Sequence, residues 1–260
     1  MAGGGALAAV AAVLVLALLA AAGWLVLQRQ SAAIGMRNLG TAAARKSRSV
    51  VIAGPMGAGK TALWCYLRFP GTAATQAVPR TQTSMGVNAS EAVVGGVPAY
   101  LVDVPGHQKF GADRDAHLAS ASAVVFVVDS AEAARDARPA AEALYDVLAS
   151  SGLVERECPV LVLCNKQDDA LAASNARVRA LLEAEIDALR ASRQQALDSL
   201  GAAAHDDAER AADFLGFEGK QFSFEDLAQP VQFNEASMAL GRSAGGLEMI
   251  ETWIAESLRQ

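Results

Sequence analysis

The chain contains one long run of hydrophobic residues near its start and several shorter runs further along. From Ala6 to Leu27 the chain carries no charged residue, and as a helix this stretch would extend about 33 Å, enough to cross a bilayer core. Because backbone groups in lipid must bond within their own segment, the run predicts one N-terminal transmembrane helix. Residues 1–5 precede this span, and residues 28–48 follow it as a basic linker.

Basic residues flank the predicted span on its C-terminal side, at Arg29, Arg37, Arg45, Lys46 and Arg48. By the positive-inside rule, residues 1–5 face the lumen or exterior and the rest of the chain is cytosolic. A cleaved signal peptide is the alternative, since the small residues at Ala20–Gly23, within the run, could form a cleavage site. The uncharged N-terminus and the length of the apolar run favour an anchor. The linker either contacts anionic lipid or is a solvated stem.

Shorter apolar runs predict buried β-strands. They are continuous and rich in β-branched residues, as expected of parallel strands covered on both faces. Two glycines, Gly95 and Gly96, separate residues 91–94 from the strand that follows and indicate a hairpin. The four predicted strands are 49–53, 99–104, 123–129 and 159–164. Residues 49–260 are therefore predicted to form an α/β domain with a mostly parallel central sheet and helices on both faces.

The first predicted strand leads directly into a loop with the pattern G-x-x-x-x-G-K-[ST]. In this strand-to-helix context, glycines let successive backbone N–H groups point at phosphate oxygens, and the helix adds the positive end of its dipole. The motif alone has another explanation, a glycine-rich turn before a helix. The predicted phosphate-binding residues are Gly54, Pro55, Met56, Gly57, Ala58, Gly59, Lys60, Thr61 and Ala62.

Further groups for a phosphate and a metal follow along the chain. Asp103 ends the second strand and can hold Mg²⁺, and Gly106 can offer its N–H to a γ-phosphate. Between the first two strands, Thr81, Gln82, Thr83 and Ser84 form a hydroxyl-rich segment expected to sense the nucleotide. Either Thr83 or Ser84 is expected to complete the metal shell. If Ser84 provides this hydroxyl, the predicted Mg²⁺ ligands are Thr61, Ser84 and Asp103.

The fourth strand delivers Asn165, Lys166 and Asp168 at its carboxyl end, where open α/β sheets bind ligands. The Asp168 carboxylate can accept the paired N–H donors of guanine, and adenine lacks that pair. Lys166 can lay its stem along the base, while Asn165 can tie this loop to the phosphate loop. A later loop with Ser237 and Met238 can close over the base. The motifs and their order predict a guanine nucleotide site that binds GTP and Mg²⁺.

These residues resemble the Ras-like small GTPases, and more closely the family of signal recognition particle receptor beta subunits. The resemblance rests on the N-terminal anchor, on a long helical insertion and on motifs that stand as TQTS (81–84), LVDVPGH (101–107), VVFVVDS (124–130), LCNKQD (163–168) and FSFEDL (222–227). It implies a P-loop small-GTPase fold behind a single membrane span.

The resemblance also implies a function in co-translational protein targeting at the endoplasmic reticulum membrane. A GTP-bound beta subunit would hold the peripheral alpha subunit as a heterodimer, near the protein-conducting channel or the ribosome. The alpha subunit would dock on residues 81–84 and 106–110. Two alternatives are an Arf-like trafficking GTPase with a permanent anchor, and a constitutive GTP-bound anchor that does not cycle.

Two departures from the GTPase pattern bear on hydrolysis. Met56 stands where many fast-hydrolysing relatives have glycine, and a bulky side chain there would crowd an arginine finger. His107 stands where many Ras-like proteins have glutamine, and it is the candidate catalytic residue because it could orient the attacking water. Packing within the switch is the alternative for His107. Slow intrinsic hydrolysis is expected.

A helical insertion is predicted at about residues 172–215. Apolar residues recur near helical spacing at Leu181, Leu182, Ile186, Leu189 and Leu197, which favours packing on the domain over binding a partner.

The charge of the chain and its cysteine content indicate which partners and which cellular environment to expect. The net charge is −6, yet no Asp or Glu precedes Glu91. This balance argues against direct nucleic-acid binding. The three cysteines fit no metal-ligand spacing, so a reduced, cytosolic environment is expected.

Overall fold

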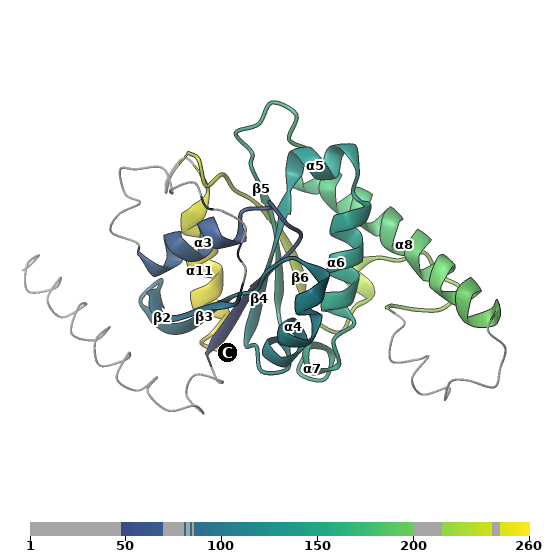
Figure 1. The fold of residues 1–260 in the computed structure, drawn as a ribbon, viewed down its shortest axis with the longest axis horizontal. Helices are drawn as coiled ribbons and strands as arrows, with labels where there is room; N and C mark the ends of the chain where they lie inside the picture. Colours follow the sequence, from purple (N-terminus) through teal and green to yellow (C-terminus); the bar gives the residue numbers. More distant parts are fainter. Residues whose placement is uncertain (1–47, 70–80, 82–83, 85, 200–214, 241–244) are drawn as a thin grey trace, which may run out of the picture.

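The computed structural model describes residues 48–69, 81, 84, 86–199, 215–240 and 245–260 (Figure 1). The predicted span at 6–27, nearly all of the linker, Gln82 and Thr83 lie outside these residues. Among the described helices, none combines the length and the apolar character needed to cross a membrane.

A six-stranded sheet forms the centre of the domain, in the order β2-β3-β1-β4-β5-β6. Only β2 is antiparallel to its neighbour; the other adjacent pairs are parallel. The mostly parallel sheet agrees with the sequence prediction. The strands are β1 (Ser49–Ala53), β2 (Asn88–Val94), β3 (Val97–Asp103), β4 (Ala123–Asp129), β5 (Val160–Asn165) and β6 (Val231–Glu235).

β3 and β5 differ from the prediction at both ends: β3 ends at Asp103 rather than Val104, and β5 ends at Asn165 rather than Cys164. Their starts differ for physical reasons. β3 begins at Val97 rather than Ala99, because residues 97 and 98 continue the antiparallel ladder up to the Gly95-Gly96 turn. β5 begins at Val160 rather than Pro159. Proline has no N–H to donate, and the first ladder bond on this side runs from the Val160 N–H to the Pro230 carbonyl.

Helices cover both faces of the sheet (Figure 1). α3 and α11 pack on one face, with Leu63 and Ile254 among their fully buried residues, and α4, α6 and α8 cover the other. Successive residues of β1 alternate between these two cores and all are buried, which explains its continuous apolar run. The helices are α3 (Lys60–Arg68), α4 (Gly111–Leu118), α5 (Ser130–Arg135), α6 (Arg138–Leu148), α7 (Ser151–Val154), α8 (Asn175–Ser199) and α11 (Leu247–Ser257). Two short 3₁₀ turns occupy Gln108–Phe110 and Phe224–Asp226.

The insertion helix α8 packs on the domain. It begins at Asn175, within the predicted insertion at about 172–215 and before the apolar pattern at 181–197, and buries Leu182, Ile186 and Leu189 in the same core as α6. Leu181 is half-buried, and the side chain of Leu197 lies outside the described residues.

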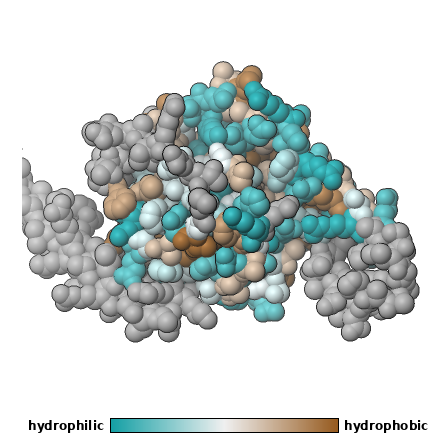
Figure 2. Space-filling model, in the orientation of Figure 1, coloured by the Kyte–Doolittle hydropathy of each residue, from teal (hydrophilic) through white to brown (hydrophobic). Residues whose placement is uncertain are grey.

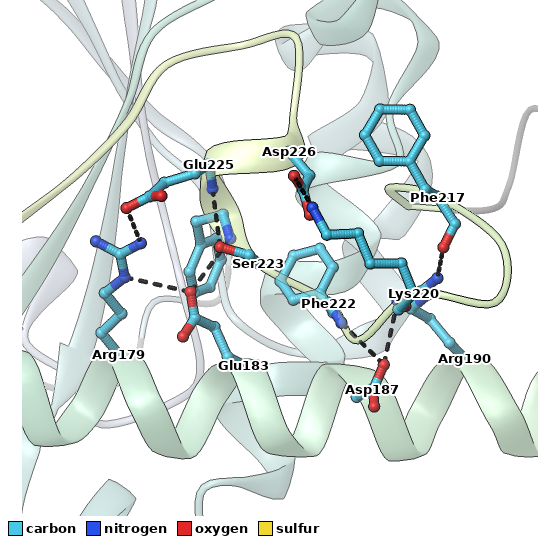
Figure 3. A network of polar contacts seen from close by, with 11 residues as sticks. Arg179, Glu183, Asp187, Arg190, Phe217, Lys220, Phe222, Ser223, Glu225 and Asp226 are labelled. Atoms are coloured by element: carbon cyan, nitrogen blue, oxygen red, sulfur yellow. Dashed lines mark hydrogen bonds and ion pairs between the residues drawn. The ribbon is translucent and has the colours of Figure 1, made fainter.

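Polar side chains of α8 also fix the chain where it returns at residues 215–227 (Figure 3). Buried Arg190 donates to the carbonyls of Phe217 and Lys220, at 2.5 and 3.1 Å. Asp187 accepts from the N–H of Phe222, one turn earlier on the helix. We call these contacts the Arg190 clamp.

Exposed large hydrophobic side chains are scattered among hydrophilic residues on the face drawn in Figure 2. Over the described residues as a whole, the exposed large hydrophobic side chains are Met56, Phe69, Val154, Leu171, Phe217, Leu240 and Met249. Single exposed apolar residues are usual on a protein surface. Of the seven, only Met56 belongs to the phosphate loop.

Candidate functional site

The phosphate loop, residues 54–59, joins β1 to α3 and brings backbone groups close together. Gly59 adopts φ 103°, and a Cβ added there would lie 2.3 Å from the Asn165 amide nitrogen. A Cβ on Gly106, in the facing loop, would lie 2.8 Å from both the Met56 backbone nitrogen and the Lys60 ammonium nitrogen. Glycine is therefore required at both positions, since any side chain would push these loops apart.

Lys60 is buried, with 6% of its surface exposed, at the first position of α3. Its ammonium donates to the Pro55 carbonyl at 2.7 Å, which folds the loop around the side chain. Burial lowers the pKa of Lys60 to about 8, and the negative charge of Asp103 opposes this effect. A partly desolvated cation at a helix N-terminus is a suitable place for an anion.

Thr61, Ser84 and Asp103 meet beside Lys60. The Thr61 hydroxyl donates to Asp103 Oδ2 at 2.8 Å and lies 2.9 Å from the Ser84 hydroxyl. Asn88 of β2 donates to the same carboxylate oxygen at 3.1 Å and to Ser84 at 3.3 Å. Ser84, one of the two hydroxyl residues considered for this position, thus lies beside Thr61 and Asp103, and Thr83 lies outside the described residues.

The residues of this cluster fit a divalent cation. Asp103 is fully buried, and its second oxygen, Oδ1, accepts no hydrogen bond from any described residue. A buried carboxylate oxygen without a donor is costly unless a cation satisfies it. Two hydroxyls and one carboxylate are the oxygen ligands that Mg²⁺ prefers, and Mg²⁺ commonly keeps few protein ligands beside a phosphate.

Lys60, Thr61 and Ser84 line one cavity of about 120 Å³. Its walls come from the phosphate loop, from Thr81 and Ser84, and from Pro105 and Gly106. Residues that precede β2 and residues that follow β3 in the sequence therefore line the same cavity. Ala62, the remaining residue predicted for this part of the site, packs partly against the α3–α11 core.

Asn165 connects three loops at the end of β5. Its buried side chain donates to the Ala58 carbonyl at 2.7 Å, and its oxygen accepts from the Met238 N–H at 3.4 Å. The predicted tie between the base loop and the phosphate loop is present in this geometry. Met238 is buried and contributes its backbone to the same junction.

Asp168 lies on the exposed side of the base loop, residues 165–168. One of its carboxylate oxygens accepts from the Ser237 hydroxyl at 2.5 Å, so a residue far along the chain orients it. The 236–238 loop also approaches through backbone bonds, with the Gln167 N–H donating to the Ala236 carbonyl. A carboxylate held in this way can accept paired donors from a base.

His107 is exposed and does not line the phosphate cavity. Its Nδ1 accepts from the Lys109 N–H at 3.2 Å, within its own loop. Together with Met56, Phe110 and Arg114, it lines a neighbouring cavity of about 240 Å³ against α6. The two cavities share Met56, Pro105 and Gly106.

The family is settled by comparison with known proteins. A family model described as the signal recognition particle receptor beta subunit matches residues 45–231. Signal recognition particle receptor subunit beta of Mus musculus is 36% identical over an alignment of 221 residues, which covers 82% of this chain and 78% of that protein. The chain belongs to the signal recognition particle receptor beta subunit family. The Homo sapiens subunit is 34% identical over 216 residues, covering 80% of this chain and 76% of that one.

Solved structures of the family share the fold. The structure described as "The Structure of the Mammalian SRP Receptor" aligns with a TM-score of 0.65 at 33% identity, covering 81% of this chain and 100% of that chain. The SRb-GTP/SRX complex from Chaetomium thermophilum aligns at 0.61 and 25% identity, covering 80% and 99%. An SRb-GDP-Mg structure from the same organism aligns at 0.58 and 27%, covering 81% and 97%. The chain therefore has the small-GTPase α/β fold.

Sequence reasoning missed two polar residues that hold this family's motifs in place here. Asn88 contacts both Ser84 and Asp103, but a single asparagine at the start of an edge strand carries no recognisable signal. Asp129 ends β4 within the segment VVFVVDS, where it was given no function, yet its side chain accepts a hydrogen bond from Lys166. The signal available in the sequence was its position, as the first polar residue at the end of a continuous apolar run.

Proposed function

We propose that this chain is the membrane-anchored, GTP-binding beta subunit of a signal recognition particle receptor. It recruits the alpha subunit to the endoplasmic reticulum membrane for co-translational protein targeting. Family membership and the site support this function together. The observation that carries it is the phosphate cavity, which the phosphate loop, Ser84 and Gly106 all line.

Within this proposal each predicted residue has one function. Lys60 and the backbone N–H groups of residues 54–62 other than Pro55 bind the phosphates, and Asp168 selects guanine with support from Ser237. Thr61, Ser84 and Asp103 would hold Mg²⁺, which supplies charge neutralisation to the phosphates when bound. Thr81 lines the phosphate cavity, and Gln82 and Thr83 complete the segment that senses the nucleotide.

Nucleotide sensing is expected at Ser84 and Gly106, because both lie on the wall where a terminal phosphate would end. Ser84 is held by bonds to Thr61 and Asn88 rather than by a rigid element, so its position can depend on the ligand. The partner surface comprises residues 81–84 and 106–110, which include this wall. A partner that prefers one nucleotide state must contact residues that differ between the states.

Slow hydrolysis is part of the proposal. The position of His107, beside the phosphate cavity rather than in it, supports a low rate in the isolated subunit. It also favours the second candidate function, a constitutive anchor that retains GTP and does not cycle. Purified full-length chain should turn over GTP more slowly than about 1 s⁻¹, and a faster rate would contradict the expectation.

The membrane anchor is proposed from residues 6–27, with the GTPase domain in the cytosol. Contacts with the protein-conducting channel or the ribosome belong to the same proposal.

A pull-down from detergent-solubilised membranes tests the function. The full-length chain, loaded with GTP, with GDP or with no nucleotide, is used to capture the alpha subunit. The switch function predicts strong capture with GTP and weak capture otherwise. Equal capture in all three states would support the constitutive anchor, because a ligand shifts an equilibrium only through differential affinity. No capture in any state would contradict both.

A further inference from the structure

Asp129 lies at the carboxyl end of β4, directly beside the base loop. The parallel register between β4 and β5 places it opposite Asn165. Its Oδ2 accepts a hydrogen bond from the Lys166 ammonium at 2.5 Å. A carboxylate from outside the G-x-x-x-x-G-K-[ST], D-x-x-G and N-K-x-D motifs thus fixes a motif side chain.

The carboxylate of Asp129 is itself fixed by the backbone. Its other oxygen, Oδ1, accepts from the N–H groups of Ala131 and Glu132, at 3.1 and 3.2 Å, and so caps α5. The two oxygens therefore perform different tasks, one holding the helix and one holding Lys166. The Asp129 side chain is 19% exposed, whereas that of Lys166 is 41% exposed.

Lys166 needs such a constraint for two reasons. Its backbone has φ 65°, a left-handed conformation that is uncommon outside glycine and persists only when surrounding contacts impose it. Its side chain has four rotatable bonds, whose ordering on ligand binding would weaken affinity by roughly 10- to 30-fold. A lysine already held in the free protein avoids part of that loss.

The neighbouring residue reinforces the same loop. Buried Ser130 accepts from the Gln167 side-chain amide at 3.0 Å, and its carbonyl accepts from the Ala173 N–H. The pair Asp129-Ser130 thus contacts two consecutive residues of the base loop, Lys166 and Gln167. Such paired contacts hold a strained loop in one conformation.

We propose that Asp129 is a positioning residue of the base site, which orders Lys166 before the nucleotide binds. The proposal rests on the guanine nucleotide function proposed above. It predicts that the Asp129 charge strengthens nucleotide binding. Simple electrostatics predicts the opposite, because a carboxylate near a bound triphosphate repels it. The direction of the effect therefore separates the two explanations.

The substitution Asp129→Asn tests the proposal in the full-length chain. Asparagine caps a helix about as well as aspartate, so α5 keeps its cap while Lys166 loses its ionic partner. The affinities for GTP and GDP should each fall roughly fivefold to tenfold. Tripolyphosphate, which carries no base, should bind the variant and the unsubstituted chain equally. Thermal unfolding without nucleotide should be unchanged.

Two further variants make the test specific. Asp136→Asn is the matched control, since Asp136 also accepts from a backbone N–H at the start of a helix, that of Arg138 at 3.0 Å, and its loss of charge should leave GTP binding unchanged. Lys166→Met keeps the apolar stem and removes the ammonium. In this background Asp129→Asn should have no further effect, because the two substitutions remove the same contact.

The outcomes separate the failure of this inference from the failure of the function. GTP affinity that is equal or higher in Asp129→Asn would overturn the positioning function, as would additive effects with Lys166→Met. Equal losses for tripolyphosphate and GTP would indicate general damage to the site and would also overturn it. No detectable binding of GTP or GDP by the unsubstituted chain would instead refute the proposed function.

Discussion

Arg190→Ala should release the chain that returns from the insertion to β6. The guanidinium is 5% exposed and donates to two carbonyls of residues 217–220 and to Asp187 (Figure 3). A hydrogen bond from a charged donor contributes about 1.5 to 3 kcal/mol, so the two carbonyl bonds together contribute about 3 to 6 kcal/mol. Part of this free energy is regained in the variant, because the two freed carbonyls belong to exposed residues and become hydrated. A net loss of about 3 kcal/mol is expected.

Amide hydrogen exchange measures this loss where it occurs. A loss of about 3 kcal/mol in the opening free energy corresponds to roughly 100-fold faster exchange. Peptides that contain Phe222 and Phe224 should report it, because their N–H groups bond Asp187 and Glu183 on α8. Peptides from β1 should exchange at the rate of the unsubstituted chain.

Two variants control the experiment. Arg193→Ala removes a side chain that is 45% exposed and bonds Asp146 at 3.0 Å, so it should cost below about 1 kcal/mol. Arg190→Lys keeps the charge but lacks the planar fork, so it should restore at most about half of the lost protection. Equal exchange at 217–224 in Arg190→Ala and Arg193→Ala would refute the clamp.

Three other results are expected. Asp168→Asn should shift base preference from guanine towards xanthine, measured by competition between GTP and xanthosine triphosphate; unchanged GTP affinity would contradict the guanine assignment. Asn165→Ala should weaken GTP binding more than tenfold and destabilise the fold by about 2 kcal/mol in urea, because two buried backbone groups lose a partner. Asn165→Asp should not restore binding, since a carboxylate cannot donate to the buried carbonyl. Cys65 should react first with a maleimide at pH 8, by mass spectrometry, since it is only half-buried. Burial raises the pKa of Cys158 to about 11 and that of Cys164 to about 12, so both should react only on unfolding, and equal labelling would argue against this burial.

Much of the fold followed from the apolar runs, because parallel strands buried on both faces leave a continuous signal. β1 and β4 have the predicted bounds, and β5 is shifted by one residue at each end, its start because of Pro159. The apolar pattern was less informative for β2 and for the first residues of α8. Half-buried strands and the polar first turns of a helix are specified by tertiary contacts rather than by a run of apolar residues.

The site was predictable where motif residues carry the chemistry and unpredictable where other residues support them. Lys60, Thr61 and Asp168 stand in patterns whose spacing fixes their function. Asn88 and Asp129 act through neighbours brought close only by the sheet register, Asn88 opposite Asp103 and Asp129 opposite Asn165. No spacing in the sequence encodes such pairs, so only the folded arrangement identifies them.

The insertion lies, in the sequence, between the two halves of the base site. Asp168 and Ser237 are 69 residues apart and yet form a hydrogen bond. The entropy cost of closing such a loop grows by only about 0.6 kcal/mol for each doubling of its length. Contacts at its entry and exit can therefore offset that cost, and the structure has them: Glu235 accepts from the Asn175 N–H at 2.7 Å, and Arg190 holds the returning chain. A long insertion can thus add surface along α8 while the base loop keeps its geometry.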